Sequence, residues 1–238
     1  IETPATDGSW TTANEWTDTG VPTNPSANFS WREKWTQPSD IIQHFIIEFY
    51  TDNTNDTGDY FQLCYDRSAN GGGAPQTDDV RIDWVGHAQS GLTIYQGNGT
   101  GWQVLGGLNW GGDIFIAESI SDSPSNSTMH WIIELWINKS NPAFDITTSN
   151  YQPGLRIAVY DASNSAAGEQ AWPPTSQDVP NDWGLEVGTT DPIPEALTVG
   201  AVIVLSSVAI AVSFYCLRKR PKTERYSPEK TSEMNCKP

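Results

Sequence analysis

Carboxylates crowd two short stretches of the chain. Asp52, Asp56 and Asp59 lie in the first, DNTNDTGD, and Asp78 and Asp79 are adjacent in the second. Calcium binds several hard oxygen ligands, and loops rich in Asp and Asn supply them. Both stretches are therefore candidate calcium sites, although the spacing of the first does not match an EF-hand loop. Solvated turn residues are the alternative interpretation of both.

Aromatic side chains are a second source of chemistry, since a ring offers a ligand a large rigid contact area and a π-face. Trp102 and Trp110 lie in the glycine-rich segments GTGW and LNWGG, where little backbone crowds the ring. Trp84, Tyr95 and Trp136 lie in strand-like segments. We predict Trp84, Trp102 and Trp110 as ligand-binding residues, with packing into the core as the alternative for each.

No catalytic constellation is apparent in the sequence. A pair of carboxylates can hydrolyse glycosides, but no strand end offers an obvious pair of acid and nucleophile. His44, His87 and His130 are scattered, without the spacing of a metal site or a catalytic triad. We therefore expect a protein that is not an enzyme, and glycoside hydrolysis is the less favoured alternative.

Short apolar strands separated by turns must position these residues. In 80–86 apolar and charged residues alternate, as in a strand with one buried face. The segment 40–52 is apolar on both faces, which favours a central strand. Further segments of strand-like pattern are 28–36, 59–66, 92–97, 106–120, 129–138 and 154–163. Together they predict an all-β fold, an antiparallel β-sandwich, with Trp10 and Trp16 tucked against its core.

An uncharged apolar segment, 196–217, follows the strands. A helix of this length covers roughly 33 Å, enough to cross a bilayer. Four basic residues follow within 218–222, and such a flank places the C-terminus in the cytoplasm. We predict an extracellular domain at 1–186, a stalk at 187–195, a single-pass transmembrane α-helix at 196–217 and a basic cytoplasmic tail at 218–238. A buried core helix is the alternative, but it would show a polar face.

The charge balance excludes one class of partner. The formal net charge is −16, and seven of the 13 Lys and Arg residues follow residue 217. The part before residue 217 is therefore strongly acidic. Because phosphate contacts need Lys and Arg, we expect that the extracellular part binds no nucleic acid.

Signs of export accompany the predicted membrane segment. Cys64 is the only cysteine before residue 216, so the extracellular part cannot form an internal disulfide, and its strand pattern predicts a buried thiol. Because an extracellular domain has to be exported, we expect Ile1 to follow a removed signal segment. Five N-x-S/T sequons predict a glycoprotein, with chance occurrence as the alternative. They lie at Asn28, Asn55, Asn98, Asn126 and Asn138.

Several motifs occur in a recognisable order. They are DGSWTTANEW near the start, DYFQLCYD, WIIELWI followed by GLRIAVYD, and the closing AWPP…DWG. This order resembles the DOMON-like superfamily, which includes family 9 carbohydrate-binding modules and the haem subunit of ethylbenzene dehydrogenase. The resemblance covers most of 5–186 and implies a β-sandwich that binds a sugar or a haem.

The resemblance also bears on single residues. Arg81 matches the sugar-binding arginine of the carbohydrate-binding modules, and Gln62 stands where they carry a sugar-contacting acid. Their two clamping tryptophans have no aromatic counterpart in 53–58 or 173–182. The haem branch requires axial ligands such as Met, Lys or His. Met129 falls on the apolar face of its predicted strand, so we expect core packing there and do not expect haem.

The leading hypothesis is a membrane-anchored cell-surface protein whose extracellular domain binds glycan or another extracellular ligand, with Ca²⁺ as a candidate cofactor. A structural subunit of a cell envelope or filament, which self-associates or binds an envelope protein, is the alternative, since exposed strand edges pair readily. Haem-based electron transfer is the second alternative. We expect the protein in the cell membrane, with its N-terminal domain outside and its C-terminus in the cytoplasm.

Overall fold

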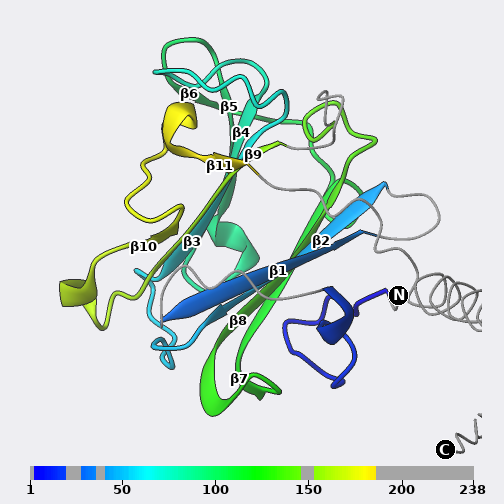
Figure 1. The fold of residues 1–238 in the computed structure, drawn as a ribbon, viewed down its shortest axis with the longest axis vertical. Coiled ribbons are helices and arrows are strands. Elements are labelled where there is room, and N and C mark those ends of the chain that lie inside the picture. Colours follow the sequence, from blue (N-terminus) through cyan, green and yellow to red (C-terminus); the bar gives the residue numbers. More distant parts are fainter. Residues whose placement is uncertain (1–2, 20–27, 36–40, 146–152, 186–238) are drawn as a thin grey trace, which may run out of the picture. The chain divides into compact units, whose positions relative to one another are not determined.

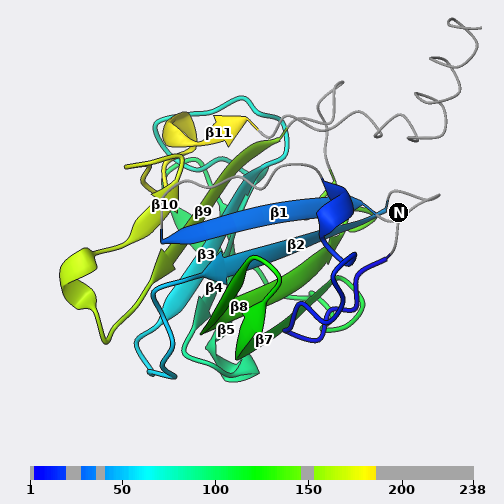
Figure 2. The same ribbon diagram turned by 60° about the horizontal axis from the view of Figure 1, so that its bottom comes forward.

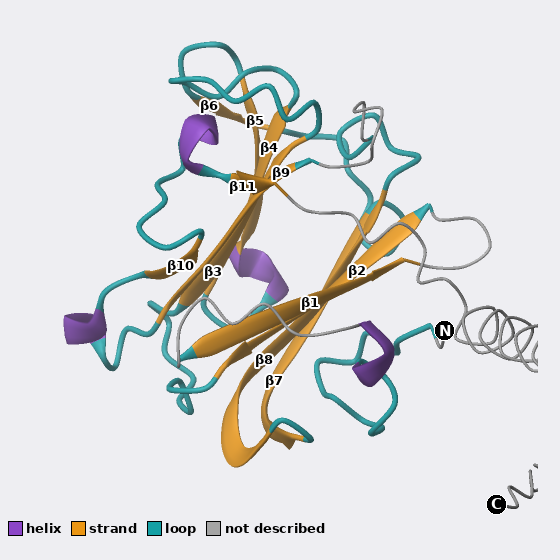
Figure 3. Cartoon of the chain, viewed as in Figure 1, coloured by secondary structure: helices purple, strands orange, loops and turns teal. Residues whose placement is uncertain are grey.

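Strands, short turns and loops make up the part of the chain that the computed structural model describes, residues 3–19, 28–35, 41–145 and 153–185. This part belongs to the unit Ile1–Gly188, and its strands form two antiparallel sheets (Figures 1 and 3). Its helices are single 3₁₀ turns: η1 (Thr17–Thr19), η2 (Gln89–Gly91), η3 (Ser165–Ala167) and η4 (Pro180–Asp182). The predicted all-β architecture is confirmed.

The predicted stalk, transmembrane helix and tail lie outside the described residues. Among the residues that are described, no helix has the length and apolar character needed to cross a membrane. The predicted membrane topology therefore stays a prediction.

Sheet A contains four strands in the order β1-β2-β8-β7 (Figure 2). Their bounds are β1 (Phe29–Trp35), β2 (Ile42–Phe49), β7 (Ile114–Ser123) and β8 (Asn126–Asn138). The register places Ile47 of β2 between Trp31 of β1 and Ile133 of β8. Strand β2 is therefore an inner strand, as its apolar sequence predicts.

Sheet B follows the order β10-β9-β3-β4-β5-β6, and β11 also pairs with β9. Its strands are β3 (Tyr60–Asp66), β4 (Asp79–Val85), β5 (Leu92–Gly97), β6 (Trp102–Val104), β9 (Gly154–Tyr160), β10 (Gln170–Trp172) and β11 (Gly184–Leu185). The closing segment 161–185 thus returns to the edge of the sheet beside β9. This return brings residues far apart in the sequence onto one sheet.

The core lies between the two sheets because each has one apolar face. In β4, Val80, Ile82 and Trp84 are buried among the core residues, and the alternating Arg81 and Asp83 are only half-buried, as predicted. Full burial of such a side chain contributes roughly 1.5–3 kcal/mol. The other strands supply Trp31, Phe45, Ile47, Phe61, Leu63, Tyr65, Ile116, Trp131, Ile133, Leu135, Leu155 and Ile157 to the same cluster.

The N-terminal segment 3–19 covers part of the outer face of sheet A. Trp10 and Trp16 pack there against Ile46 and Ile132 and form a second apolar cluster. Both tryptophans are buried, as expected, but they lie against the outside of a sheet and not in the core between the sheets. The segment therefore acts as a cover for the polar and apolar residues beneath it.

A buried carboxylate, Glu134, binds the N-terminal segment 3–19 through hydrogen bonds. It lies on the outer face of β8, where Oε1 accepts a hydrogen bond from Trp16 Nε1 (2.8 Å). Its Oε2 accepts hydrogen bonds from the backbone N–H groups of Asp7 and Gly8, both at 2.9 Å. Because three donors converge on one carboxylate, the path of the segment is specified by polar contacts as well as by packing.

Candidate functional site

The outer face of sheet B carries a row of polar side chains across four strands. The register pairs Cys64 of β3 with Arg81 of β4, and Arg81 with Tyr95 of β5. On its other side, Cys64 pairs with Arg156 of β9. Since directly paired residues point to the same face, two arginines flank a buried thiol, and burial raises the pKa of that thiol.

Arg81 is held by two carboxylates. Its Nη1 contacts Asp178 Oδ2 at 2.6 Å, and its Nη2 contacts Asp83 Oδ2 at 3.0 Å. Asp83 also accepts a hydrogen bond from Gln62 Nε2 at 2.9 Å, and burial raises the pKa of its carboxyl group. The guanidinium plane is therefore fixed in orientation by partners from β4 and from the closing segment.

Aromatic rings surround the same guanidinium. Arg81 Cζ lies 4.3 Å from the ring centroid of Tyr95 and 5.2 Å from that of Trp102. Trp102 stacks on Trp183 of the closing segment, with centroids 6.3 Å apart and planes 13° from parallel. We call the set Gln62, Arg81, Asp83, Tyr95, Trp102 and Asp178 the Arg81 face.

Arg156 continues the polar network toward the edge of the sheet. Its Nη1 donates to Gln62 Oε1 and its Nη2 to Glu169 Oε1. Its Nε donates to the backbone carbonyl of Ser176 at 3.2 Å. Because Arg156 is 2% exposed, these contacts replace its hydration and tie the closing segment to β9 and β3.

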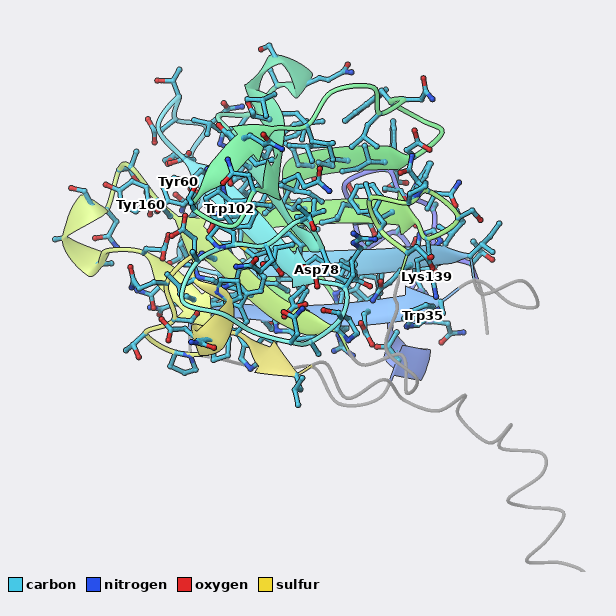
Figure 4. All side chains as sticks on the ribbon, turned by 90° about the horizontal axis from the view of Figure 1, so that it is seen from above. Trp35, Tyr60, Asp78, Trp102, Lys139 and Tyr160 are labelled. Carbon is cyan, nitrogen blue, oxygen red and sulfur yellow. The ribbon has the colours of Figure 1, made fainter. Side chains whose placement is uncertain are left out.

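Two tyrosines mark the far end of this network. Tyr60 of β3 and Tyr160 of β9 stack, with centroids 5.1 Å apart, and lie side by side in Figure 4. Tyr60 Oη donates to Glu169 Oε2 at 2.8 Å. Burial raises the pKa of the Tyr60 phenol, so this hydroxyl stays a donor.

The Arg81 face combines charged groups of both signs with aromatic rings. Arg81 is paired with Asp83 and Asp178, and the adjacent buried Arg156 is paired with Glu169, so neither sign of charge dominates strongly. Arg81 and Asp83 are 15% and 19% exposed, which leaves them reachable from solvent. The face offers guanidinium and amide donors, carboxylate acceptors and aromatic rings within one small area.

The residues predicted to bind ligand separate into two places. Arg81 and Trp102 meet on the Arg81 face. Trp84 is 3% exposed and lies in the core, where it stacks on Phe61 and on Trp110 at 6.3 and 6.1 Å. Since the half-buried Trp110 also packs against that core, the structure favours the core-packing interpretation for Trp84 and Trp110.

Sequence reasoning did not select three residues of this region. Glu169, Asp178 and Trp183 all come from the closing segment, which is far from Arg81 in the chain. The AWPP…DWG motif marked that segment, but its pairing with β9 is a long-range feature. The stretch 173–182 lacks an aromatic, yet Trp183 immediately after it supplies one.

The first group of carboxylates joins Asp52 and Asp59 with Asp161, which follows β9. Each offers an oxygen within 4.8 Å of the others, and all three are buried. Asp59 Oδ2 lies 2.9 Å from His87 Nε2. Asp52 Oδ2 has no hydrogen-bond partner among the described residues. We call these three residues the Asp52 cluster; Asp56 lies outside it and accepts from Thr54 Oγ1.

The second group joins Asp78 and Asp79 with Asp66, the last residue of β3. Its carboxylate oxygens also lie within 4.8 Å of one another. Asp79 is fully buried, and its Oδ1 has no hydrogen-bond partner among the described residues. Burial and the neighbouring carboxylates Asp66 and Asp78 raise the pKa of Asp79 to about 7. We call these three residues the Asp79 cluster.

The predicted glycosylation sites differ in access. Asn55 and Asn98 are exposed, while Asn28, Asn126 and Asn138 are half-buried. Asn98 Oδ1 accepts hydrogen bonds from Thr100 N and Thr100 Oγ1 at 3.0 and 2.9 Å. Asn138 Nδ2, the atom to which a glycan would attach, donates to the carbonyl of Gly112 at 3.1 Å. Attachment at Asn138 would replace one of the two hydrogens on this nitrogen.

Met129 does not pack in the core, and this expectation was wrong. Its side chain is 49% exposed, whereas Trp131 two residues later is fully buried. The pairing of β8 with β2 begins only at Trp131, which faces Phe49, so Met129 lies in the β7–β8 hairpin beyond the edge of β2. Alternation in a strand predicts burial only where a second layer lies beneath it.

Comparisons with known proteins give few relatives. No protein-family model matches the chain, and no curated protein matches it significantly. A family 9 carbohydrate-binding module from Caldicellulosiruptor kristjanssonii in complex with glucose is similar at 14% identity and a TM-score of 0.49, with 81% of this chain and 97% of that chain covered. A family 9 module from the same organism in complex with cellotriose has 14% identity, a TM-score of 0.44 and coverages of 72% and 78%. At this identity neither likeness assigns a ligand to this chain.

Proposed function

We propose that this protein is a non-enzymatic glycan-binding module and that the Arg81 face is its binding surface. The observation that carries the proposal is the fixed guanidinium of Arg81, which lies between two carboxylates and against two aromatic rings. Sugars are neutral, present several hydroxyl groups and have apolar C–H faces. Charged groups held in fixed positions form strong hydrogen bonds to hydroxyls, and an aromatic ring packs against the C–H face.

The charge balance of the face supports a neutral ligand over an ion. A phosphate or carboxylate ligand would meet Asp83 and Asp178 beside the arginine, and like charges in close contact oppose binding. A cationic ligand would meet the guanidinium of Arg81 instead. The ligand class with the fewest conflicts is therefore a neutral oligosaccharide.

Substitution Trp102→Ala tests this assignment. We expect binding to an array of neutral oligosaccharides to fall about tenfold or more, since an aromatic contact is worth about 1.5 kcal/mol. Trp136→Ala is the matched control, because Trp136 is also half-buried but belongs to sheet A. Equal binding by the two variants, with both folded, would contradict the location of the site. A blank array from the unmodified chain would contradict the function itself.

We also propose that the Asp52 and Asp79 clusters bind Ca²⁺. Carboxylate oxygens are the ligands that Ca²⁺ prefers, and each cluster holds a buried oxygen without a hydrogen-bond partner among the described residues. An unpaired buried acceptor is costly, and a cation would remove that cost. A calorimetric titration with calcium chloride that gives no binding heat would refute the proposal.

The proposed setting is the outer surface of a membrane, with 196–217 as a single-pass anchor and N-glycans at the exposed Asn55 and Asn98. The uncharged segment and its basic flank support the anchor. Carbonate extraction of membranes distinguishes an integral from a peripheral protein. Release of the chain by carbonate would speak against the anchor.

A further inference from the structure

The Asp52 cluster and the Asp79 cluster differ in their position relative to the Arg81 face. The Asp79 cluster lies at one end of β3, because Asp66 is its last residue and pairs with Asp79. The Asp52 cluster lies at the other end, because Asp59 immediately precedes β3. A strand of this length separates its ends by about 20 Å. The two sites can therefore be tested independently.

The Asp79 cluster shares a row of the sheet with Trp102. Val80, next to Asp79, pairs with Gln96 of β5, and the neighbouring Gly97 pairs with Trp102. Gly97 also packs so closely on the loop before β4 that a Cβ atom at this position would lie 2.2 Å from the carbonyl oxygen of Gln76. The loop therefore packs directly against the residue of β5 that pairs with Trp102.

The loop 67–78 winds around the Asp79 cluster and binds β5 and the β5–β6 turn. Asp79 Oδ2 accepts a hydrogen bond from the backbone N–H of Gln76 at 2.6 Å. The loop carbonyls of Thr77 and Pro75 accept from Gln96 Nε2 at 2.6 Å and from Gly99 N at 2.8 Å. The cluster thus fixes the loop, and the loop contacts β5 and the turn that leads to Trp102.

The same loop holds the closing segment. Gly72 N donates to Asn181 Oδ1 at 2.8 Å, and Asn181 N donates to the carbonyl of Gly72 at 3.2 Å. Asn181 belongs to η4, which lies between Asp178, the partner of Arg81, and Trp183, which stacks on Trp102. Loop 67–78 therefore contacts the two elements that flank the Arg81 face, the end of β5 with its turn on one side and η4 on the other.

We propose that a divalent cation bound at the Asp79 cluster controls the affinity of the Arg81 face for glycan, whereas a cation at the Asp52 cluster acts only on stability; this inference rests on the proposed function. The hydrogen-bond partners of the Asp52 cluster include Thr54, Ala162 and His87, which lie outside the Arg81 face. The buried Asp79 Oδ1 has no hydrogen-bond partner among the described residues, and this unpaired oxygen is the reason to expect a cation at the Asp79 cluster. Coupling between two sites is reciprocal, so bound glycan would also raise the affinity of the Asp79 cluster for the cation.

The test compares Asp79→Asn with Asp52→Asn, two substitutions that conserve shape and remove one carboxylate each. Calcium chloride titration is expected to show one site fewer in each variant. In saturating calcium, we expect the binding of neutral oligosaccharides on the array to fall at least tenfold in Asp79→Asn and to stay within twofold in Asp52→Asn. Asp78→Asn, at a half-buried position of the same cluster, should behave as Asp79→Asn does.

Hydrogen exchange supplies a readout that does not depend on glycan. Calcium should protect amides of 67–78 and 177–183 in the unmodified chain and in Asp52→Asn, but not in Asp79→Asn. Absence of this protection in the unmodified chain, or equal loss of glycan binding in both variants, overturns the inference. A blank array together with intact protection overturns the proposed function and the affinity part of the inference, and leaves the coupling of cation to loop established.

Discussion

Replacing Arg156 with leucine is expected to destabilise the folded chain by about 3 kcal/mol. The guanidinium is 2% exposed and contacts Gln62, Glu169 and the carbonyl of Ser176. Leucine would leave these acceptors without their donor, and the buried ones could not recover water. The closing segment would also lose a tie to sheet B, so the loss should reach the Arg81 face through Asp178.

Chemical unfolding followed by tryptophan fluorescence measures this change. Glu169→Gln is the matched control, since Glu169 is 30% exposed and glutamine keeps its acceptor oxygen. We expect the control to cost about 1 kcal/mol or less, as for a partly exposed ion pair. An Arg156→Leu variant as stable as the Glu169→Gln variant would show that the network does not hold the closing segment.

Local sequence pattern predicted the strands well because a strand with one buried face alternates in sequence and a strand buried on both faces is continuously apolar. The alternation in β4 located Val80 and Ile82 in the core and Arg81 on the opposite face. The continuous apolar character of β2 predicted an inner strand, and the register confirms it. These features depend on neighbours two residues apart in the chain, which a sequence displays directly.

The site was harder to predict because long-range pairing assembles it. Asp178 reaches Arg81 only because the closing segment returns to β9. Asp66 and Asp161 complete the two carboxylate clusters from strand ends that sequence spacing does not connect with the acidic loops. The glycine-rich surroundings of Trp110 predict access to solvent, but they do not show that its half-buried ring stacks on Trp84.

Glu134 should make the stability of the chain depend on pH. Burial raises the pKa of its carboxyl group to about 7 from the ordinary 4.5; nearby Glu15 also raises it, while the donors Trp16, Gly8 and Asp7 oppose the rise. Between pH 4.5 and pH 7, Glu134 therefore keeps its proton in the folded state, whereas the same group has lost it in the unfolded state. A group of this kind contributes stability that is fully present below pH 4.5 and is lost as the pH rises through 7. The expected loss is about 3 kcal/mol between pH 4 and pH 8.

Glu134→Gln isolates this contribution, because glutamine resembles the protonated acid and does not titrate. The variant should match the unmodified chain near pH 5 and become the more stable of the two near pH 8, as measured by chemical unfolding at each pH. Burial also raises the pKa values of Asp52 and Asp79, to about 6 and about 7. These two groups lower the stability with rising pH equally in the unmodified chain and in the Glu134→Gln variant. The difference between the chains therefore belongs to Glu134. Parallel pH profiles would mean that Glu134 stays ionised beneath the N-terminal segment, held by its three donors.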